Sequence, residues 1–248
     1  MEAWFISDIH LKTAEERNGQ ILLRFLRSLL EKNPKQVHLF MLGDIFDLWI
    51  GPSEFFARRF PEHMQALKDL IAAGGKVTFI EGNHDVHVEK YFEKKLGVKV
   101  FVEAQYFQID NLKVRVEHGD LINLNDEKYL KYRAFIRNPR YKFILYMFPG
   151  WLWNWAGTRA SKKSRDKSGE YRARNEAQLL AMIRKHTERA YQEEPFDVIV
   201  SGHMHVFDDH MTTVNGKPVR TVNLGSWFEE KVRVFHIKDG QCDWVALN

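Results

Sequence analysis

The sequence contains a single cysteine, Cys242, among its 248 residues, so no disulfide can form within the chain. The beginning of the chain has no basic lead and no small-residue cleavage site of the kind that marks a secretory signal. The uncharged run Phe143–Gly157 is too short, and too broken by Pro149 and Gly150, to cross a bilayer as a helix. These absences exclude a disulfide-built domain and a helical membrane anchor, and they indicate a cytoplasmic protein.

The overall composition is that of an ordinary globular protein. Hydrophobic residues make up 44% of the chain and charged residues 28%, which excludes a disordered or fibrous chain. The length favours a single domain over residues 1–248, with room for an insert. The net charge of +4 is mildly basic and hints at an anionic partner without naming it.

Strand and helix patterns alternate first, and β-hairpin patterns follow. Apolar residues at helical spacing predict a helix over Gly19–Asn33, while Asn215-Gly216 and Asp239-Gly240 are typical hairpin turns. Further strands are predicted at Ala3–Ile6, Val37–Leu42, Lys76–Ile80, Tyr106–Ile109, Lys113–Val116 and Asp197–Val200, and further helices at Pro61–Ala73, His87–Leu96 and Glu170–Gln192. This order predicts an α/β sandwich with mixed sheets. Residues 121–169 form a connection far longer than usual, which indicates an inserted functional element.

Residues that can bind metals follow five of the predicted strands. They are Asp8 and His10, Asp44 and Asp47, Asn83 with His84 and Asp85, His118 and Asp120, and His203 and His205. In α/β folds, ligands bind outside the carboxyl ends of the strands. A lone Asp-x-His or His-x-His is more often a surface or core feature, whereas five groups at five strand ends indicate one shared metal site.

The spacing and chemistry of these residues suit metal binding. Residues two apart in an extended chain point the same way, so Asp8 and His10 can hold one ion, and His203 and His205 can reach one cluster. The donors are oxygen and imidazole without thiolate, which argues against a structural zinc site and favours catalytic Mn, Mg, Fe or Zn.

Seven candidate ligands are too many for a single ion: Asp8, His10, Asp44, Asn83, His118, His203 and His205. They suit two divalent ions that share Asp44 as a bridge. Two such ions carry four positive charges and the two aspartates remove two, so the remaining surplus attracts phosphate. Paired ions can activate water and clamp the oxygens of an in-line displacement at phosphorus.

Together these motifs resemble the calcineurin-like metallophosphoesterase superfamily, whose pattern is D-x-H, GD-x-x-D, GNHD, a later H and GH-x-H. The resemblance covers residues 8–205 and implies a four-layer αββα sandwich with mixed sheets and a dinuclear centre, with manganese as its foremost metal. It places Asp8, His10, Asp44 and His205 around one ion, and Asp44, Asn83, His118 and His203 around the other.

A closer resemblance, over nearly the whole chain, is to the UDP-2,3-diacylglucosamine pyrophosphatase family of lipid A synthesis. It rests on residues 43–51, on His118-Gly119-Asp120 with Asp126 and Tyr129, on the insert, and on residues 223–227. It implies hydrolysis at the α-phosphorus to UMP and 2,3-diacylglucosamine 1-phosphate (lipid X), with the insert as a helical cap for acyl chains. Members of that family carry Arg where this chain has His84, and their cap pattern is matched only loosely by residues 161–167.

The insert is basic and aromatic. Residues 128–174 hold thirteen Lys or Arg and two acidic residues, so the rest of the chain is net acidic. Three Trp at alternate positions, 151, 153 and 155, beside basic flanks suit peripheral contact of residues 143–157 with the inner face of the cytoplasmic membrane. The alternatives are ordinary packing of these aromatics on the core and binding of nucleic acid. Nucleic acid ranks lower because the apolar run is nearly free of charge.

We therefore expect a metal-dependent hydrolase of an amphiphilic phosphorylated small molecule, with no protein partner implied. Asn83, His84 and Asp85 are the expected catalytic residues, with Asp85 orienting His84. Asp47 and Asp120 are expected to orient the ligands. The substrate's polar end is expected to meet Asp126, Tyr129, Arg159, Ser161 and Arg165. The alternatives are another lipid-linked, cyclic-nucleotide or nucleic-acid phosphodiester as substrate, or a non-catalytic scaffold on the same fold.

Overall fold

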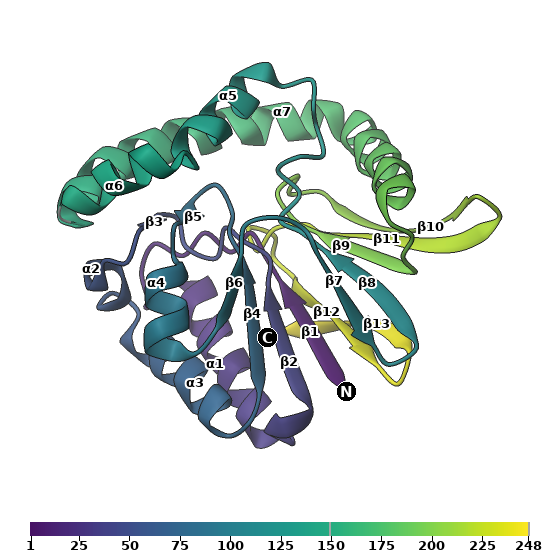
Figure 1. The fold of residues 1–248 in the computed structure, drawn as a ribbon, viewed down its shortest axis with the longest axis horizontal. Coiled ribbons are helices and arrows are strands. Elements are labelled where there is room, and N and C mark those ends of the chain that lie inside the picture. The colour runs from purple at the N-terminus through teal and green to yellow at the C-terminus, as the bar shows by residue number, and fades with distance from the viewer. Residues whose placement is uncertain (149, 248) are drawn as a thin grey trace.

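The chain folds into two packed β-sheets with helices on both outer faces (Figure 1). The computed structural model describes the backbone of residues 1–148 and 150–247, together with their side chains outside 144–145 and 154–174. Helices α1 and α3 cover one sheet, and the C-terminal part of α7 covers the other. This arrangement confirms the four-layer αββα sandwich expected from the sequence.

The first sheet has six strands in the order β13-β12-β1-β2-β4-β6. Four neighbouring strands, β1, β2, β4 and β6, run parallel, and β12 and β13 are antiparallel additions at one side. The bounds of the six strands are Glu2–Ile6 (β1), Val37–Met41 (β2), Lys76–Ile80 (β4), Lys99–Phe101 (β6), Val232–Lys238 (β12) and Gln241–Leu247 (β13).

The second sheet has five strands in the order β10-β11-β9-β8-β7. Here β8, β9 and β11 run parallel, while β7 and β10 pair antiparallel at the edges, so both sheets are mixed as predicted. The bounds are Gln105–Ile109 (β7), Leu112–Val116 (β8), Val198–Ser201 (β9), Phe207–Val214 (β10) and Lys217–Leu224 (β11); a short parallel ribbon joins β3 (Trp49–Ile50) to β5 (Asp85–Val86).

Alternation of side chains along the strands separates the core into layers. In β1, Trp4 and Ile6 pack towards α1 and α3, while Ala3 and Phe5 pack between the two sheets. A third cluster joins the second sheet to α7. The helices outside the insert are α1 (Arg17–Glu31), the 3-10 turn η1 (Pro34–Gln36), α2 (Glu54–Ala57), α3 (Pro61–Ala72), α4 (Glu89–Tyr91) and the π-helical turn η2 (Phe92–Leu96).

The long connection after β8 forms a helical arch above the carboxyl ends of the parallel strands (Figure 1). It contains α5 (Glu127–Ile136), α6 (Pro139–Met147) and the beginning of α7 (Gly150–Glu193). We call α5, α6 and the part of α7 before Asn175 the cap. Helix α7 continues from the cap onto the second sheet, and its one break in helical backbone is Asn175 (φ −131°, ψ 19°).

Two predicted helices differ from the observed ones. The helix expected at Glu170–Gln192 begins twenty residues earlier, because residues 158–174 contain few apolar side chains and so give no periodic signal. The helix expected at His87–Leu96 begins at Glu89 and changes to a π-helical turn before Gly97, whose φ of +81° ends it as predicted. Both hairpin turns are confirmed, with positive φ at Asn215-Gly216 and Asp239-Gly240.

Within the described part of the chain, no helix combines the length and the apolar character needed to cross a membrane.

Candidate metal centre

The structure brings all seven candidate ligands to one rim of the sandwich. Strands β1, β2 and β4 of the first sheet are followed by the ligands Asp8 with His10, Asp44, and Asn83, and strands β8 and β9 of the second sheet are followed by His118, and His203 with His205. Since the parallel strands end on the same side, the two sheets contribute to a single cluster below the cap.

One group of ligand atoms surrounds His205. The Nε2 atoms of His10 and His205 lie 3.1 Å apart, and His205 Nε2 lies 3.0 Å from Asp8 Oδ1. Asp44 Oδ2 completes this group at 3.8 Å from His10 Nε2.

The second group surrounds Asn83. Its side-chain Oδ1 lies 3.1 Å from His118 Nε2 and 3.0 Å from His203 Nδ1. The two imidazole nitrogens are 3.2 Å apart, and Asp44 Oδ2 lies 3.7 Å from His118 Nε2. His118 Nδ1 donates to the carbonyl of Leu42 at 2.8 Å, which leaves its Nε2 lone pair directed into the group.

Asp44 belongs to both groups through one oxygen. Its Oδ1 accepts hydrogen bonds from the backbone N–H groups of Asn83 and His84, each at 2.9 Å. Its Oδ2 is therefore left between the His10 side and the His118 side. This division of the carboxylate is the geometry of a bridging ligand.

These separations also fit ligands that share a divalent ion. Two ligands that are each about 2.1 Å from one ion lie about 3.0 Å apart at right angles and about 3.4 Å apart at the tetrahedral angle. Asp8 Oδ1 is fully buried and has no hydrogen-bond partner, although His205 Nε2 is 3.0 Å away. A buried carboxylate oxygen without a donor needs a cation, so the residues present fit a metal.

The backbone at the ligands is strained. Asp8, His10, Asp44, His203 and His205 all have φ between 51° and 66°, in the left-handed region that non-glycine residues avoid. Each such residue costs about 1–2 kcal/mol. Five such residues at one rim indicate that orienting these side chains lowers the stability of the fold.

Glycines give the ligand loops room to approach one another. A Cβ on Gly82 would lie 2.1 Å from Asp44 Oδ1, and a Cβ on Gly202 would lie 2.2 Å from Asp8 Oδ2. No side chain fits at either position, which explains why glycine stands next to the ligands there.

Burial sets the protonation states that metal binding needs. Burial lowers the pKa of His10 to about 3 and that of His203 to about 4, so both rings are neutral and keep a free lone pair at neutral pH. Burial alone would raise the pKa of Asp44, but His118, His84 and His10 outweigh it and lower that pKa. Burial also opposes charge on His118, yet Asp44 and Asp8 raise its pKa, so a proton competes with a metal there.

His84 is positioned differently from the expectation. Its Nδ1 donates to the backbone carbonyl of Asp47 at 2.8 Å, and not to Asp85. The carboxylate of Asp85 instead accepts the N–H groups of Asp44, Ile45 and Gly82 at 2.8–2.9 Å. Asp85 therefore ties two ligand loops together, because a buried carboxylate among free backbone donors satisfies them before it reaches a side chain.

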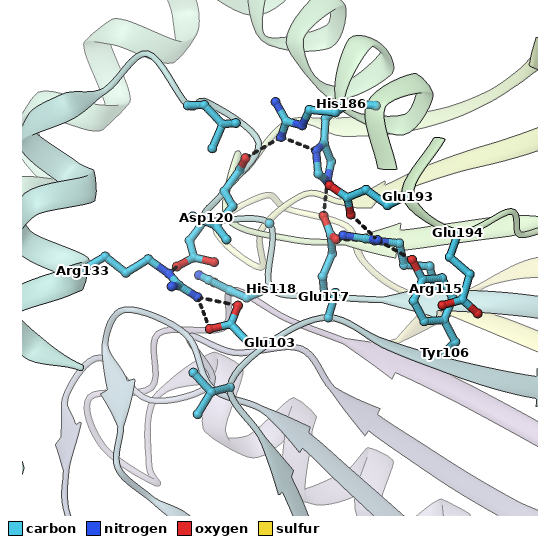
Figure 2. Close-up of a pocket in the computed structure, with 16 residues that line it drawn as sticks. Glu103, Tyr106, Arg115, Glu117, His118, Asp120, Arg133, His186, Glu193 and Glu194 are labelled. Carbon is cyan, nitrogen blue, oxygen red and sulfur yellow. Dashed lines mark hydrogen bonds and ion pairs between the residues drawn. The ribbon is translucent and has the colours of Figure 1, made fainter. Parts of the chain in front are cut away.

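Of the two residues expected to orient ligands, Asp47 lies with His10 and His84 in a third small group of metal-binding atoms. Asp120 is buried two residues after His118, and its Oδ2 accepts from Arg133 Nε at 2.7 Å (Figure 2). The same oxygen accepts from Tyr129 Oη at 2.9 Å.

The expected substrate contacts fall into two sets. Asp126 is exposed and caps α5, because its side chain accepts from the N–H of Tyr129 at 2.9 Å. The ring of Tyr129 lies 5.6 Å from that of His203, which places it beside the second ligand group. The side chains of Arg159, Ser161 and Arg165 lie outside the described residues.

The structure adds three residues that the sequence reasoning did not single out. Arg133 and Arg137 reach the ligand loops from α5, at four-residue spacing from Tyr129, and that spacing was the available signal. Phe228 stacks on the ring of His10 with 5.5 Å between the ring centroids.

Comparisons with known proteins agree with the site. The family model of calcineurin-like phosphoesterases matches residues 1–207. A UDP-2,3-diacylglucosamine hydrolase of Klebsiella pneumoniae is 30% identical over 233 residues, which are 93% of this chain and 92% of that protein. The enzyme of the same name from Coxiella burnetii is 28% identical over 245 residues, 98% of this chain and 96% of that protein.

Among solved structures, an archaeal phosphodiesterase aligns over the whole of both chains with a TM-score of 0.49 and 12% identity. The family match over most of the chain, the hydrolase relatives and the cluster of metal-binding atoms lead to one conclusion. The chain belongs to the calcineurin-like phosphoesterase family and is a metal-dependent hydrolase.

Proposed function

We propose that this protein hydrolyses the pyrophosphate bond of UDP-2,3-diacylglucosamine, giving UMP and 2,3-diacylglucosamine 1-phosphate. The observation that carries the proposal is a doubled ligand group, bridged by Asp44, beneath a helical cap that shows apolar side chains at its surface. Relatives named for this substrate align with the cap as well as with the body, since the alignments cover 93–98% of the chain.

We propose two divalent ions, with Mn²⁺ as the preferred metal. Asp8, His10 and His205 would hold one and Asn83, His118 and His203 the other, and Asp44 would serve both. Mixed carboxylate, amide and imidazole donors without thiolate suit Mn²⁺. When bound, such a pair activates water and neutralises charge on the phosphoryl oxygens.

The residues around the ions would divide the remaining work. Asn83 can hold its amide N–H groups towards a phosphoryl oxygen while its Oδ1 serves as a ligand. His84 is held through Nδ1, so its Nε2 remains available either to protonate the departing oxygen or to contact a phosphate. Water adds to the α-phosphorus, the bond from that phosphorus to the bridging oxygen breaks, and the bridging oxygen leaves with the lipid-bearing phosphate.

The cap would bind the amphiphilic part of the substrate. Asp126, Tyr129, Arg159, Ser161 and Arg165 are proposed to meet its polar end. Phe143, Met147 and Trp151 are 68%, 67% and 60% exposed, which supports peripheral contact of residues 143–157 with the inner face of the cytoplasmic membrane.

The test is a comparison of substrates with the purified protein in Mn²⁺. UDP-2,3-diacylglucosamine, bis-p-nitrophenyl phosphate, cAMP and single-stranded DNA are offered to the wild type and to Asp44→Asn, and products are identified by mass spectrometry. We expect UMP and the lipid monophosphate, with kcat/KM for the lipid substrate at least a hundredfold above the others. In Asp44→Asn, kcat/KM for the lipid substrate should fall at least a thousandfold.

Equal or greater turnover of cAMP or DNA would show that the substrate assignment is wrong while leaving the hydrolase class intact. Unchanged turnover in Asp44→Asn would show that the metal centre takes no part in the reaction.

A further inference from the structure

Helix α5 contacts the body of the protein through several directed polar interactions. None of its residues is fully buried, and those that are least exposed lie on one face that includes Tyr129 and Arg133, followed by Arg137 at the end of the helix. These three residues are four positions apart, so they form one stripe along the helix. A stripe of this kind fixes the position of the helix through directed hydrogen bonds.

The middle of the stripe holds the loop that carries His118. Arg133 Nε donates to Asp120 Oδ2 at 2.7 Å, and its Nη2 contacts both carboxylate oxygens of Glu103 at 3.0 and 3.1 Å. Tyr129 donates to the same oxygen of Asp120 at 2.9 Å. Figure 2 shows Arg133 reaching across from α5 to both carboxylates next to His118.

The end of the stripe holds the loop that carries Asn83. Arg137 Nη1 donates to the buried carboxylate of Glu81 at 3.0 Å, and its Nη2 donates to the carbonyls of Glu81 and Gly82 at 3.2 and 3.1 Å. The other oxygen of Glu81 accepts the N–H of Val88 at 2.8 Å. The backbone directly before Asn83 is therefore fixed from the cap.

The beginning of the stripe meets the third loop, since the ring of Tyr129 lies 5.6 Å from the ring of His203. All three contacts thus fall on one ligand group, the one formed by Asn83, His118 and His203. Among the described residues, no hydrogen bond or ion pair joins α5 to Asp8, His10 or His205.

The His118 loop is also held from its other side. His186 Nε2 donates to Glu117 Oε1 at 2.5 Å, and Arg189 donates to the carbonyl of Leu121 at 2.8 Å, both from α7. A cavity of about 540 Å³ separates these α7 contacts from the α5 contacts (Figure 2). The core of the body alone does not fill the space around this loop, so its position depends on the helices that flank it.

We propose that Tyr129, Arg133 and Arg137 are positioning residues for one of the two metal positions, so that seating of the cap on the body and filling of the Asn83–His118–His203 position are a single linked equilibrium. This inference rests on the proposed two-metal centre. By linkage, the ion stabilises the docked cap as much as the docked cap stabilises the ion. Residues that orient ligands from behind alter metal affinity by about 10–100-fold.

The test measures metal binding without substrate. The full-length protein is stripped of metal and titrated with Mn²⁺, and free Mn²⁺ is followed by electron paramagnetic resonance. Arg133→Gln/Arg137→Gln removes both guanidinium contacts, and Tyr129→Phe removes a single hydroxyl in case the double variant does not fold. Lys131→Gln is the matched control, because Lys131 lies on the same helix with its side chain 81% exposed.

We expect the wild type and Lys131→Gln to bind two Mn²⁺. The double variant should bind one Mn²⁺ with an affinity within twofold of the wild type and the second Mn²⁺ at least tenfold more weakly. Tyr129→Phe should lower the affinity for the second Mn²⁺ by about two- to fivefold. Hydrogen exchange of residues 127–137 should slow when Mn²⁺ is added to the wild type, and this slowing should disappear in the double variant.

Equal loss of both ions, or retention of both affinities, in a folded variant would overturn the inference while wild-type hydrolysis stays intact. A wild type that binds a single Mn²⁺ would overturn the two-metal proposal itself. The substrate comparison described above detects failure of the substrate assignment, and that failure leaves the Mn²⁺ titration unaffected.

Discussion

Each oxygen of the Asp44 carboxylate has its own task. Oδ1 accepts two backbone N–H groups from the loop after β4, while Oδ2 faces imidazoles on both sides. The backbone bonds fix the side chain before any ion arrives, so the site is largely preorganised. The strained φ angles at Asp8, His10 and Asp44 show the cost of this preorganisation.

His84 provides a test of its two candidate roles. His84→Gln cannot give up a proton, so we expect kcat for UDP-2,3-diacylglucosamine to fall about 10²–10⁴-fold if His84 is the general acid. Hydrolysis of bis-p-nitrophenyl phosphate should fall far less, because p-nitrophenolate leaves without protonation. Steady-state kinetics on both substrates measures the difference.

His84→Arg serves as the companion variant, since arginine keeps a donor for phosphate but holds its proton at every working pH. Full activity of His84→Arg on the lipid substrate would assign His84 to phosphate contact and rule out the general acid role.

His38 provides a pH dependence far from the metal centre. Burial, with Lys76 and Lys99 adding to it, lowers the pKa of His38 to about 4 from a usual value of 6.5. Between these two pH values the unfolded chain therefore binds a proton at His38 that the folded chain does not bind. The contribution of His38 to the free energy of unfolding is complete above pH 6.5 and is lost as the pH falls from 6.5 to 4. We expect His38 to account for up to about 3 kcal/mol of the decrease in the free energy of unfolding.

The measurement is urea unfolding of the wild type and His38→Phe at pH 7 and pH 4.5. Phenylalanine should preserve the stacking on Phe40, and the variant should lose less stability on acidification. An identical loss in both proteins would contradict the assignment.

At the scale of elements, predictability followed the presence of an apolar pattern. The strands that carry the ligands alternate between two cores, and their ends are marked by Asp, Asn, His and Gly, so the rim could be predicted. The contacts of helix α5 could not, because its hydrogen bonds to the body come from tyrosine and arginine side chains. Residues 158–174 of α7 likewise contain few apolar side chains, so they gave no periodic signal.

The orientation of His84 was unpredictable for a different reason. A neighbouring carboxylate in sequence, Asp85, suggested a partner, but backbone N–H groups of the β2 loop satisfy that carboxylate first. Which donors reach the Asp85 carboxylate depends on how the loops fold, so it could not be predicted from the sequence.

The apolar surface of α6 and α7 supports a prediction about membranes. Phe143→Ser and Trp151→Ser each remove a side chain that is more than half exposed, and burial of such a side chain in lipid contributes about 1.5–3 kcal/mol. Binding to vesicles containing phosphatidylglycerol should therefore weaken about tenfold or more in each variant, as measured by co-sedimentation.

Met211→Ser is the matched control, because Met211 is 57% exposed on β10, outside the cap. If it weakens binding as much as the cap variants do, the contact surface lies elsewhere.

At the scale of the whole molecule, the metal centre joins the two sheets. Asp8, Asp44 and Asn83 belong to the first sheet and the imidazoles of His118, His203 and His205 to the second. Ions bound there would cross-link two layers whose contact is otherwise apolar. Metal binding should thus stabilise the entire sandwich and not one loop.

Metal removal tests this connection. With both proposed sites at a hundred times their Kd, Mn²⁺ should stabilise the folded protein by about 2.7 kcal/mol per ion. The total of about 5 kcal/mol corresponds to a rise in Tm of about 10–20 °C over the sample in EDTA. Differential scanning calorimetry provides the measurement. Asp44→Asn should show little of the shift, and an equal shift in that variant would place the stabilising ion at another site.

The course of α7 from the cap onto the second sheet, with a break in helical backbone at Asn175, has a consequence for how such proteins can be recombined. Since one helix belongs to both the cap and the sandwich, a splice within the helix would disturb the register of everything after it. Asn175, where the backbone leaves helical geometry, is the natural seam. Chimeras that exchange caps between relatives are best joined there.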